Sequence, residues 1–229
     1  MPVSQNLHSV LLQIRTAALK YDRDPASVRL VAVSKTHPVE LIQEAWEAGQ
    51  IDFGENRTPE MAMKQAALPT ARWHMIGHLQ RRQVKDIIPF VHLIHSVDSD
   101  RLLEKINREA QACNRVVDCL LQLNISEEIA KSGIDEAGAA ALLARIDEWP
   151  QVRILGLMGM AQIRGSEDDT PVIRGQFARL RKAFEAFSAI DHPRILMQEL
   201  SMGMSDDLEE AISEGATLVR IGTAVFGQR

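Results

Sequence analysis

Short apolar runs alternate with amphipathic stretches along most of the chain. The first stretch predicts an amphipathic helix through about Tyr21, because apolar side chains recur at helical spacing at Leu7, Val10, Leu11, Ile14 and Ala18. Eight later runs predict β-strands at Arg29–Ser34, Ile51–Gly54, Arg72–Ile76, Val91–Ser96, Val116–Asn124, Val152–Met158, Arg194–Leu200 and Thr217–Ile221. The stretches between them predict helices at Pro38–Ala48, Pro59–Ala67, Gln80–Ile88, Asp100–Ala112, Glu136–Ile146, Pro171–Ser188 and Asp206–Glu214.

The order of these elements predicts the fold class. The strands recur at intervals of roughly 20–35 residues and each except the last is followed by a helix, which is typical of a closed parallel barrel. We therefore expect an α/β fold, a single (β/α)8 TIM barrel preceded by an N-terminal helix, in one domain over residues 1–229. An open doubly wound sheet is the alternative, although no Gly-x-Gly-x-x-Gly follows the first strand to favour its dinucleotide-binding form.

Composition and charge narrow the class of protein. A hydrophobic content of 45% in 229 residues is enough for one full core, and a net charge of −5 without a basic stripe argues against a nucleic-acid-binding surface. No apolar run approaches the length of a membrane span, and no charged leader with an apolar segment opens the chain. Cys113 and Cys119 lack the paired spacing of a metal site. These features predict a cytoplasmic protein that binds neither nucleic acid nor membrane. We expect a monomer, although no feature of the sequence sets the oligomeric state.

Candidate chemistry gathers where the predicted strands end, because barrels of this class carry their functional groups at the carboxyl ends of the strands. Polar side chains or bare backbone occur there at Lys35, Asn56, His78, Ser96, Asn124, Ser201, Gly222 and Thr223. Strand alternation places Lys35 on one face with Val31 and Val33. If that face points into the barrel, burial at the mouth disfavours the ammonium form of Lys35 and frees its amine to attack an aldehyde. A solvated surface lysine is the alternative.

The loops after the last two predicted strands are suited to a phosphate. Barrels often bind phosphate at this place, and the loops read Ser201-Met202-Gly203-Met204-Ser205 and Gly222-Thr223. Hydroxyl groups, bare backbone N–H groups and a helix start near Asp206 favour an anion, although Ser205 is also an ordinary N-cap residue. If the first and last strands are neighbours, the lysine lies beside this cradle. An amine beside a phosphate cradle is the minimum equipment for holding pyridoxal phosphate.

Arg220 shares a strand face with Leu218 and Gly222, so we expect it to point toward the same site. Its permanent charge beside a pyridine nitrogen would keep that nitrogen unprotonated and weaken the ring as an electron sink. An arginine salt-bridged inside the barrel is the alternative. Asn56 is placed to reach a ring hydroxyl, and His78 either lies near the ring or caps the following helix.

Eight segments, spread over nearly the whole chain, resemble the pyridoxal phosphate homeostasis protein family. They are Val31–Thr36, Phe53–Asn56, Trp73–Gln80, Ile94–Asp98, Lys131–Gly133, Gly156–Met158, Glu199–Asp206 and Val219–Gly227. The resemblance implies a barrel like the N-terminal domain of alanine racemase, with pyridoxal 5'-phosphate held as a Schiff base on Lys35. It also implies phosphate contacts from Ser201, Gly222 and Thr223, and Arg220 facing the pyridine nitrogen. A second lysine, Lys131, belongs to one of these segments but reads as a solvated loop residue.

Two segments depart from the family pattern. Arg57 stands where the family usually has an aromatic or aliphatic residue, and Ala161-Gln162-Ile163 stands where the family usually has prolines. Both lie near the predicted mouth of the barrel. They therefore bear on the shape of the loops and on access to the site.

The resemblance implies a non-enzymatic cytosolic carrier that buffers pyridoxal phosphate, takes up other B6 vitamers and passes the cofactor to apo-enzymes through transient contacts. A pyridoxal phosphate-dependent amino-acid racemase is the first alternative. It needs a second acid/base, a tyrosine from a separate domain, whereas the only tyrosine here is Tyr21 in the first helix. A phosphosugar aldolase that uses the amine of Lys35 is the second alternative, for which Glu55 is the nearest candidate carboxylate.

Overall fold

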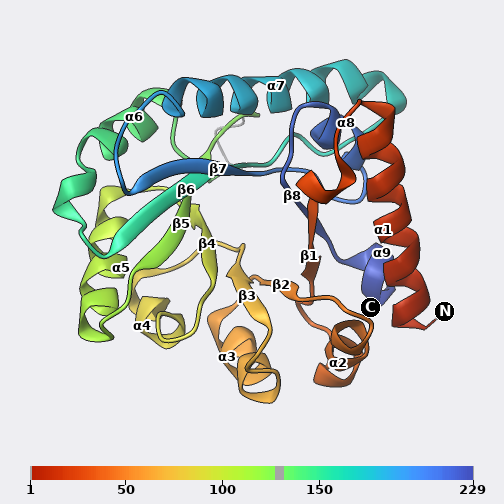
Figure 1. Cartoon of the computed structure of the whole chain (residues 1–229), viewed down its shortest axis with the longest axis horizontal. Helices are drawn as coiled ribbons and strands as arrows, with labels where there is room; N and C mark the ends of the chain where they lie inside the picture. The colour runs from red at the N-terminus through yellow and green to blue at the C-terminus, as the bar shows by residue number, and fades with distance from the viewer. Residues whose placement is uncertain (1, 127–131, 229) are drawn as a thin grey trace.

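Parallel strands form a closed barrel at the centre of the chain. The protein is described by a computed structural model that covers residues 2–126 and 132–228. Within these residues eight strands pair in chain order, and the last closes back onto the first (Figure 1). The strands are β1 (Arg29–Val33), β2 (Asp52–Glu55), β3 (Arg72–Met75), β4 (Leu93–Val97), β5 (Val117–Leu123), β6 (Val152–Gly159), β7 (Ile195–Ser201) and β8 (Leu218–Ile221). The predicted closed barrel is confirmed, and the open sheet is not what the chain forms.

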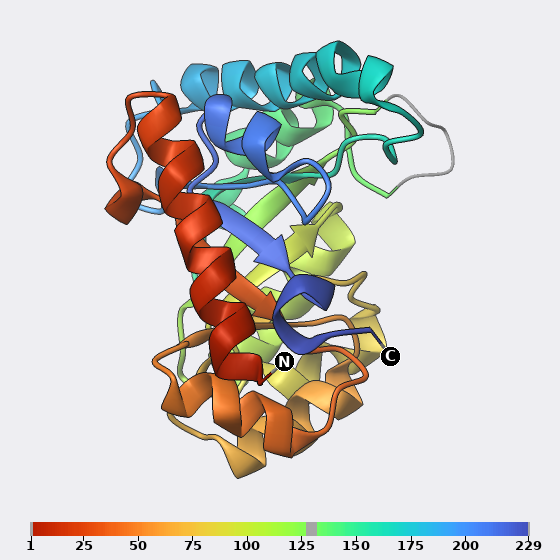
Figure 2. The same ribbon diagram turned by 90° about the vertical axis from the view of Figure 1, so that its right-hand side faces the viewer.

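Helices connect the strands and surround the barrel. In the part of the chain that the structure describes they are α1 (Val3–Lys20), α2 (Val39–Glu47), α3 (Thr58–Ala67), α4 (Val84–Ile87), α5 (Asp100–Ala112), α6 (Glu136–Ala144), α7 (Thr170–Phe187), α8 (Leu208–Ser213) and α9 (Thr223–Phe226). As predicted, α1 precedes the barrel, and it packs along α8 and α9 (Figure 2). None of the described helices is both long and apolar enough to cross a membrane.

Two helices near the end of the chain differ from the prediction. α8 begins at Leu208, two residues after the expected start at Asp206. The last strand is followed by α9, where no helix was expected. A helix of 4 residues is too short to show the i, i+3, i+4 repeat by which longer helices are recognised. Both helices begin just after loops at the carboxyl ends of the strands, so both corrections concern the candidate site.

The side chains of the strands form two apolar layers. The inner cluster fills the barrel and consists of Val31, Leu93, Leu120, Met158 and Leu218. Val31 and Leu218 belong to it, whereas their neighbours Ala32 and Val219 belong to the larger cluster between strands and helices. This alternation confirms the predicted inward faces of β1 and β8. Residues that continue these faces at the carboxyl ends therefore point toward the mouth of the barrel.

Candidate functional site

A cavity of about 460 Å³ opens at the carboxyl ends of the strands. Its lining residues are Val33, Lys35, His37, Asn56, Ile76, Met160, Met204, Ser205, Asp206, Arg220, Gly222 and Thr223. They come from both ends of the chain, because the closure of β8 onto β1 brings these ends together. The structure therefore unites most of the residues predicted for the site, with the exception of Ser201 and His78.

Lys35 lies two residues after the end of β1, and its side chain is half-buried at the cavity. In the pairing of β1 with β8, Ala32 lies opposite Ile221, so the residues after these two strands leave the barrel side by side. The predicted adjacency of the first and last strands is thus confirmed. It places the amine of Lys35 and the loop that begins at Gly222 on one cavity.

A buried ion pair lies beneath the end of β1. Lys64 from α3 donates from Nζ to the Ser34 carbonyl at 2.7 Å and to Glu55 Oε1 at 2.6 Å, and the Ser34 hydroxyl donates to the same carboxylate oxygen at 2.7 Å. Burial raises the pKa of Glu55, while the hydrogen bond from Lys64 opposes that rise. Both charged side chains are almost completely shielded from solvent. Glu55 is therefore sealed behind the strands, which removes the carboxylate that the aldolase alternative needs at the cavity.

The backbone on both sides of Lys35 is anchored by this cluster. The preceding residue, Ser34, is held by Lys64, and the backbone N–H of the following residue, Thr36, donates to Glu60 Oε2 at 2.8 Å. Thr36 has a φ of 65°, a left-handed conformation that β-branched residues rarely adopt. The hydrogen bonds therefore hold Lys35 at a bend of defined geometry rather than on a free loop.

Arg220 lies under the cavity as a buried cation. Its side chain donates to two neutral oxygens, from Nη1 to Ser201 Oγ at 2.6 Å and from Nη2 to the Gly159 carbonyl at 3.2 Å. Burial lowers the pKa of Arg220 to about 10, and the nearby charge of Asp207 opposes this, so the guanidinium stays charged at neutral pH. The alternative of a salt-bridged arginine is not what these contacts form. A buried cation that borders a cavity favours a ligand with negative charge or a lone pair there.

The two loops after β7 and β8, which the sequence predicts to bind phosphate, both line the cavity. Gly222 and Thr223 lie where α9 begins, and the N–H groups of a first helical turn have no partner within the helix. A Cβ atom on Gly222 would lie 3.0 Å from the Val33 carbonyl oxygen, so this close approach of the backbone leaves little room for a side chain. The loop after β7 contributes Ser205, which lines the same cavity.

Ser201 lies beneath the cavity rather than in it. The residue ends β7, is completely buried, and its Oγ is engaged by Arg220 and by His95 Nδ1, which lies 2.9 Å away. The loop hydroxyl at the cavity is that of Ser205. Because α8 begins only at Leu208, Ser205 is not its N-cap residue and faces the cavity instead. Of the two predicted loop hydroxyls, that of Ser205 therefore lines the cavity and that of Ser201 lies beneath it.

Of the two remaining predicted residues, Asn56 lines the cavity and His78 does not. Asn56 lines the cavity, and a Cβ atom on Gly77 would lie 2.6 Å from its carbonyl oxygen, so the glycine permits the close packing of β2 and β3 ends. His78 is exposed, with Nδ1 3.9 Å from Asp98 Oδ2, and does not line the cavity. His37 lines the cavity and was missed, because it lies in a loop without periodicity; its ring centroid is 5.2 Å from that of Phe226.

The departures from the family pattern lie at the edge of this site. Arg57 is exposed and forms an ion pair with Glu60 at 3.8 Å. Ala161 is buried, and the backbone N–H of Gln162 donates to the side chain of Gln176 on α7 at 2.9 Å. These residues therefore shape the surroundings of the cavity and are not part of its lining. Lys131 lies outside the described residues.

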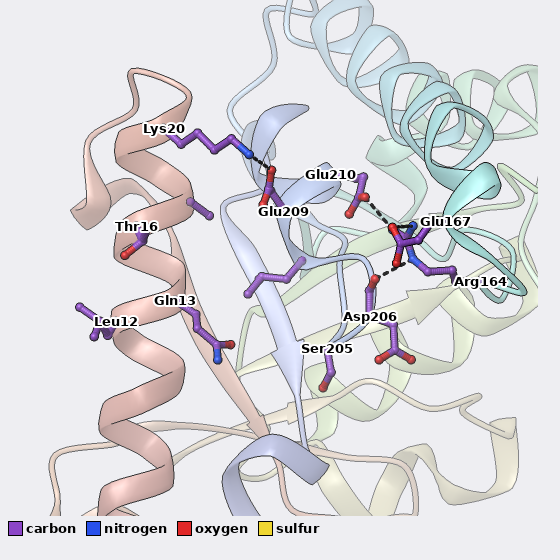
Figure 3. Close-up of a pocket in the computed structure, with 12 residues that line it drawn as sticks. Leu12, Gln13, Thr16, Lys20, Arg164, Glu167, Ser205, Asp206, Glu209 and Glu210 are labelled. Carbon is purple, nitrogen blue, oxygen red and sulfur yellow. Dashed lines mark hydrogen bonds and ion pairs between the residues drawn. The ribbon is translucent and has the colours of Figure 1, made fainter.

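A second and larger cavity, of about 720 Å³, lies between α1 and α8 (Figure 3). Ion pairs of Lys20 with Glu209 and of Arg164 with Glu210 stand at its borders. It shares Ser205 and Asp206 with the cavity at the strand ends, so one loop separates the two. This groove lies outside the barrel mouth, and its polar groups are largely paired with one another. The smaller cavity, which combines an amine with an anion cradle, is therefore the candidate site.

Comparison with known proteins identifies the family to which this chain belongs. The family model described as "Alanine racemase, N-terminal domain" matches residues 11–229. The pyridoxal phosphate homeostasis protein of Pseudomonas aeruginosa is 38% identical over 229 residues, which covers 99% of this chain and 96% of that protein. The protein of the same name from Aquifex aeolicus is 36% identical, and the match covers 100% of this chain and 99% of that one.

Solved structures agree in fold. PipY of Synechococcus elongatus with pyridoxal phosphate bound has a TM-score of 0.82 at 36% identity, and the match covers 98% of this chain and 100% of that chain. Alanine racemase from Streptomyces lavendulae has a TM-score of 0.74 at 20% identity and is covered over only 57% of its length, so this likeness concerns the fold alone. The barrel is thus of the alanine racemase N-terminal class. Within that class the chain belongs to the pyridoxal phosphate homeostasis protein family.

Proposed function

We propose that this chain binds pyridoxal 5'-phosphate at the carboxyl ends of its strands, holds it through Lys35, and buffers or delivers it inside the cell. One observation carries the proposal: Lys35, Gly222 and Thr223 line a single cavity, so an amine and an anion cradle lie together. The names of the relatives and the bound cofactor in PipY point to the same ligand.

The residues at the cavity fit the parts of this cofactor. Ser205, Gly222 and Thr223 offer hydroxyl and backbone N–H donors for its phosphate, and Lys35 offers a primary amine for its aldehyde. Arg220 and Asn56 line the same cavity, and we assign Arg220 to the ring nitrogen and Asn56 to the ring hydroxyl. His78, which does not line the cavity, has no part in this assignment. When bound, the cofactor supplies an aldehyde carbon with which the amine of Lys35 can condense, with loss of water.

The same site is poorly equipped for catalysis, so we propose a carrier rather than an enzyme. A guanidinium stays charged and cannot accept a proton, so Arg220 disfavours protonation of the ring nitrogen and weakens the ring as an electron sink. Racemisation also needs a second acid/base. The only tyrosine of the chain, Tyr21, follows α1 and donates to Glu209 at 2.8 Å, away from the strand ends.

In this proposal, the chain works as a cytoplasmic monomer. B6 vitamers that carry the phosphate share the cradle, and apo-enzymes receive the cofactor through transient contacts. The first test is direct: protein mixed with pyridoxal phosphate and then separated from free ligand by gel filtration should retain a cofactor absorption band. A protein that emerges colourless would contradict the proposal.

The phosphate assignment predicts a loss of affinity that depends on the phosphate. We expect Ser205→Ala or Thr223→Ala to weaken pyridoxal phosphate binding about 10- to 150-fold, because a hydrogen bond to a charged group contributes about 1.5–3 kcal/mol. Affinity for pyridoxal, which has no phosphate, should not change. Fluorescence titration with both ligands measures the difference. Ser188→Ala, at the residue that follows α7, is the control. If Ser201→Ala weakened pyridoxal phosphate binding and Ser205→Ala did not, the phosphate contact would belong to Ser201 instead.

The carrier proposal predicts negligible turnover. Protein loaded with pyridoxal phosphate should racemise, transaminate or decarboxylate each common amino acid no faster than the free cofactor does. Chiral chromatography, keto-acid assays and carbon dioxide release measure the three reactions. Turnover clearly above that of free cofactor, and lost in Lys35→Ala, would establish an enzyme instead.

A further inference from the structure

A continuous series of hydrogen bonds crosses the inside of the barrel beneath the cavity. His74 Nε2 lies 2.9 Å from Asp52 Oδ1, and His74 Nδ1 lies 2.9 Å from His95 Nε2. His95 Nδ1 lies 2.9 Å from Ser201 Oγ, to which Arg220 donates at 2.6 Å. All five residues are buried. We call Asp52, His74, His95 and Ser201 together the histidine relay. The relay connects the amino-terminal end of β2 with the buried cation under the cavity.

The end groups fix the two outer hydrogen bonds of the relay. Arg220 can only donate, so the oxygen of Ser201 must accept from it. At the other end, burial alone would raise the pKa of Asp52, but the hydrogen bond from His74, together with nearby positive charge, outweighs burial and lowers it. Asp52 is therefore an ionised carboxylate, which can only accept. The Nε2 atom of His74 must then carry a proton.

One proton on each ring then gives the remaining hydrogens of the relay. In this arrangement His74 carries its proton on Nε2 and accepts at Nδ1, so His95 donates to it from Nε2. Burial lowers the pKa of His95 well below its usual value, so this ring is neutral and has no proton left for Nδ1. The Ser201 hydroxyl therefore donates to His95 Nδ1. Every donor and acceptor of the relay is satisfied in this arrangement.

This direction is electrostatically favourable for both charged ends. Each group of the relay turns its lone pair toward Arg220 and its hydrogen toward Asp52. The aligned dipoles stabilise a cation at one end and an anion at the other, and their effect is strong in a medium of low dielectric constant. The carboxylate of Asp52 can thus act as a remote counter-charge for Arg220, whose direct partners are neutral oxygens.

We propose that Asp52, His74 and His95 are positioning residues for Arg220. Through Ser201 they hold the guanidinium under the cavity and orient the dipoles that stabilise its charge. The consequence for cofactor affinity rests on the proposed function, whereas the direction of the relay is a property of this chain alone.

A metal site is the competing explanation for one end of the relay. The ligand atoms of Asp52, His74 and His92 all lie within 4.8 Å of one another. However, the guanidinium of Arg72 lies 3.8 Å from Asp52 Oδ1 and would repel a divalent cation. His74 Nε2 would also have to lose the proton that it donates to Asp52. The geometry therefore favours the relay.

The first test reads the histidine protons without any cofactor. Long-range ¹H–¹⁵N spectra of protein labelled in its histidines distinguish protonated from unprotonated ring nitrogens, and His74→Gln and His95→Gln assign the signals. His74 and His95 should both carry their proton on Nε2. A proton on Nδ1 of His95 would overturn this direction of the relay. So would added zinc chloride that displaces the His74 proton, which would establish the metal site instead.

The second test changes the anionic end of the relay, Asp52. Asp52→Asn replaces an obligate acceptor by an amide that can accept or donate, so both directions become available. The tautomers of His74 and His95 should then be mixed, and the dissociation constant for pyridoxal phosphate should rise about 5- to 10-fold, a modest coupling between separate sites.

The matched control for this variant is Asp118→Asn. Asp118 lies near the amino-terminal end of β5, pairs with Arg153 at 2.7 and 2.9 Å, and is not part of the relay. It should change neither the histidine spectra nor the affinity. Equal effects of the two variants, or unchanged tautomers in Asp52→Asn, would overturn the positioning role. If the unmodified protein fails to bind the cofactor, the proposed function fails while the spectra still decide the relay.

Discussion

Replacement of Lys35 by alanine is expected to abolish covalent retention of pyridoxal phosphate. Lys35 is the one lysine among the described residues that line the cavity at the strand ends, and the backbone on each side of it is anchored. Borohydride reduction of the loaded protein should therefore add one cofactor to the peptide that contains Lys35, as read by mass spectrometry. The same treatment of Lys35→Ala should give no stoichiometric adduct, because the cradle alone offers no amine for the aldehyde.

Lys20→Ala is the matched control for this experiment. Lys20 borders the neighbouring cavity between α1 and α8 and is paired with Glu209 (Figure 3). Its removal should leave the adduct unchanged, because its ammonium group is not at the strand ends. An adduct found chiefly on the peptide that contains Lys131, with Lys35 unmodified, would contradict the assignment. Circular dichroism of each variant shows whether the loss is local.

The barrel could be predicted because its signal is repeated along the chain. Each strand is an apolar run, each connection has a helical pattern, and one misplaced boundary does not change the topology. The errors occur where the signal is shortest. α9 has 4 residues, and α8 starts two residues later than expected because Asp207 uses its carboxylate to accept the backbone N–H of Met204. That local hydrogen bond keeps the loop open before the helix begins.

The sequence predicts which strand faces point into the barrel, but not in which layer of the barrel each residue lies. The alternation of side chains along each strand correctly predicted the inward faces of β1 and β8, from which Lys35 and Arg220 reach one cavity. It could not show that Ser201 lies one layer lower, because this depends on how β7 and β8 are staggered: Ser201 pairs with Leu218, below Arg220. The contact between His74 and His95 depends likewise on two strands that the sequence cannot align. The layer of Ser201 and the contact between His74 and His95 depend on the register between neighbouring strands, which no single segment of the sequence determines.

The buried ion pair behind Lys35 predicts a large loss of stability on removal of one partner. Glu55→Ala should lower the free energy of unfolding by about 3–5 kcal/mol, because it leaves a buried ammonium group without its carboxylate. Lys64 is 1% exposed, and its other carboxylate contact, Glu60, is more distant at 3.4 Å. Urea denaturation followed by circular dichroism measures the change. The ammonium group also holds the Ser34 carbonyl, so the loss is expected to loosen the bend that carries Lys35.

Two further variants test whether an unpaired buried charge causes the loss of stability in Glu55→Ala. Glu185→Ala breaks an exposed pair with Arg181 on α7 and should cost no more than about 0.5 kcal/mol, as surface pairs within a helix do. The double variant Glu55→Leu, Lys64→Met replaces both charges by apolar groups and should recover part of the stability, since no uncompensated charge then remains. A double variant less stable than Glu55→Ala alone would show that the pair contributes through its own attraction. In that case the end of β1 would depend on the ion pair itself rather than on the avoidance of an unpaired charge.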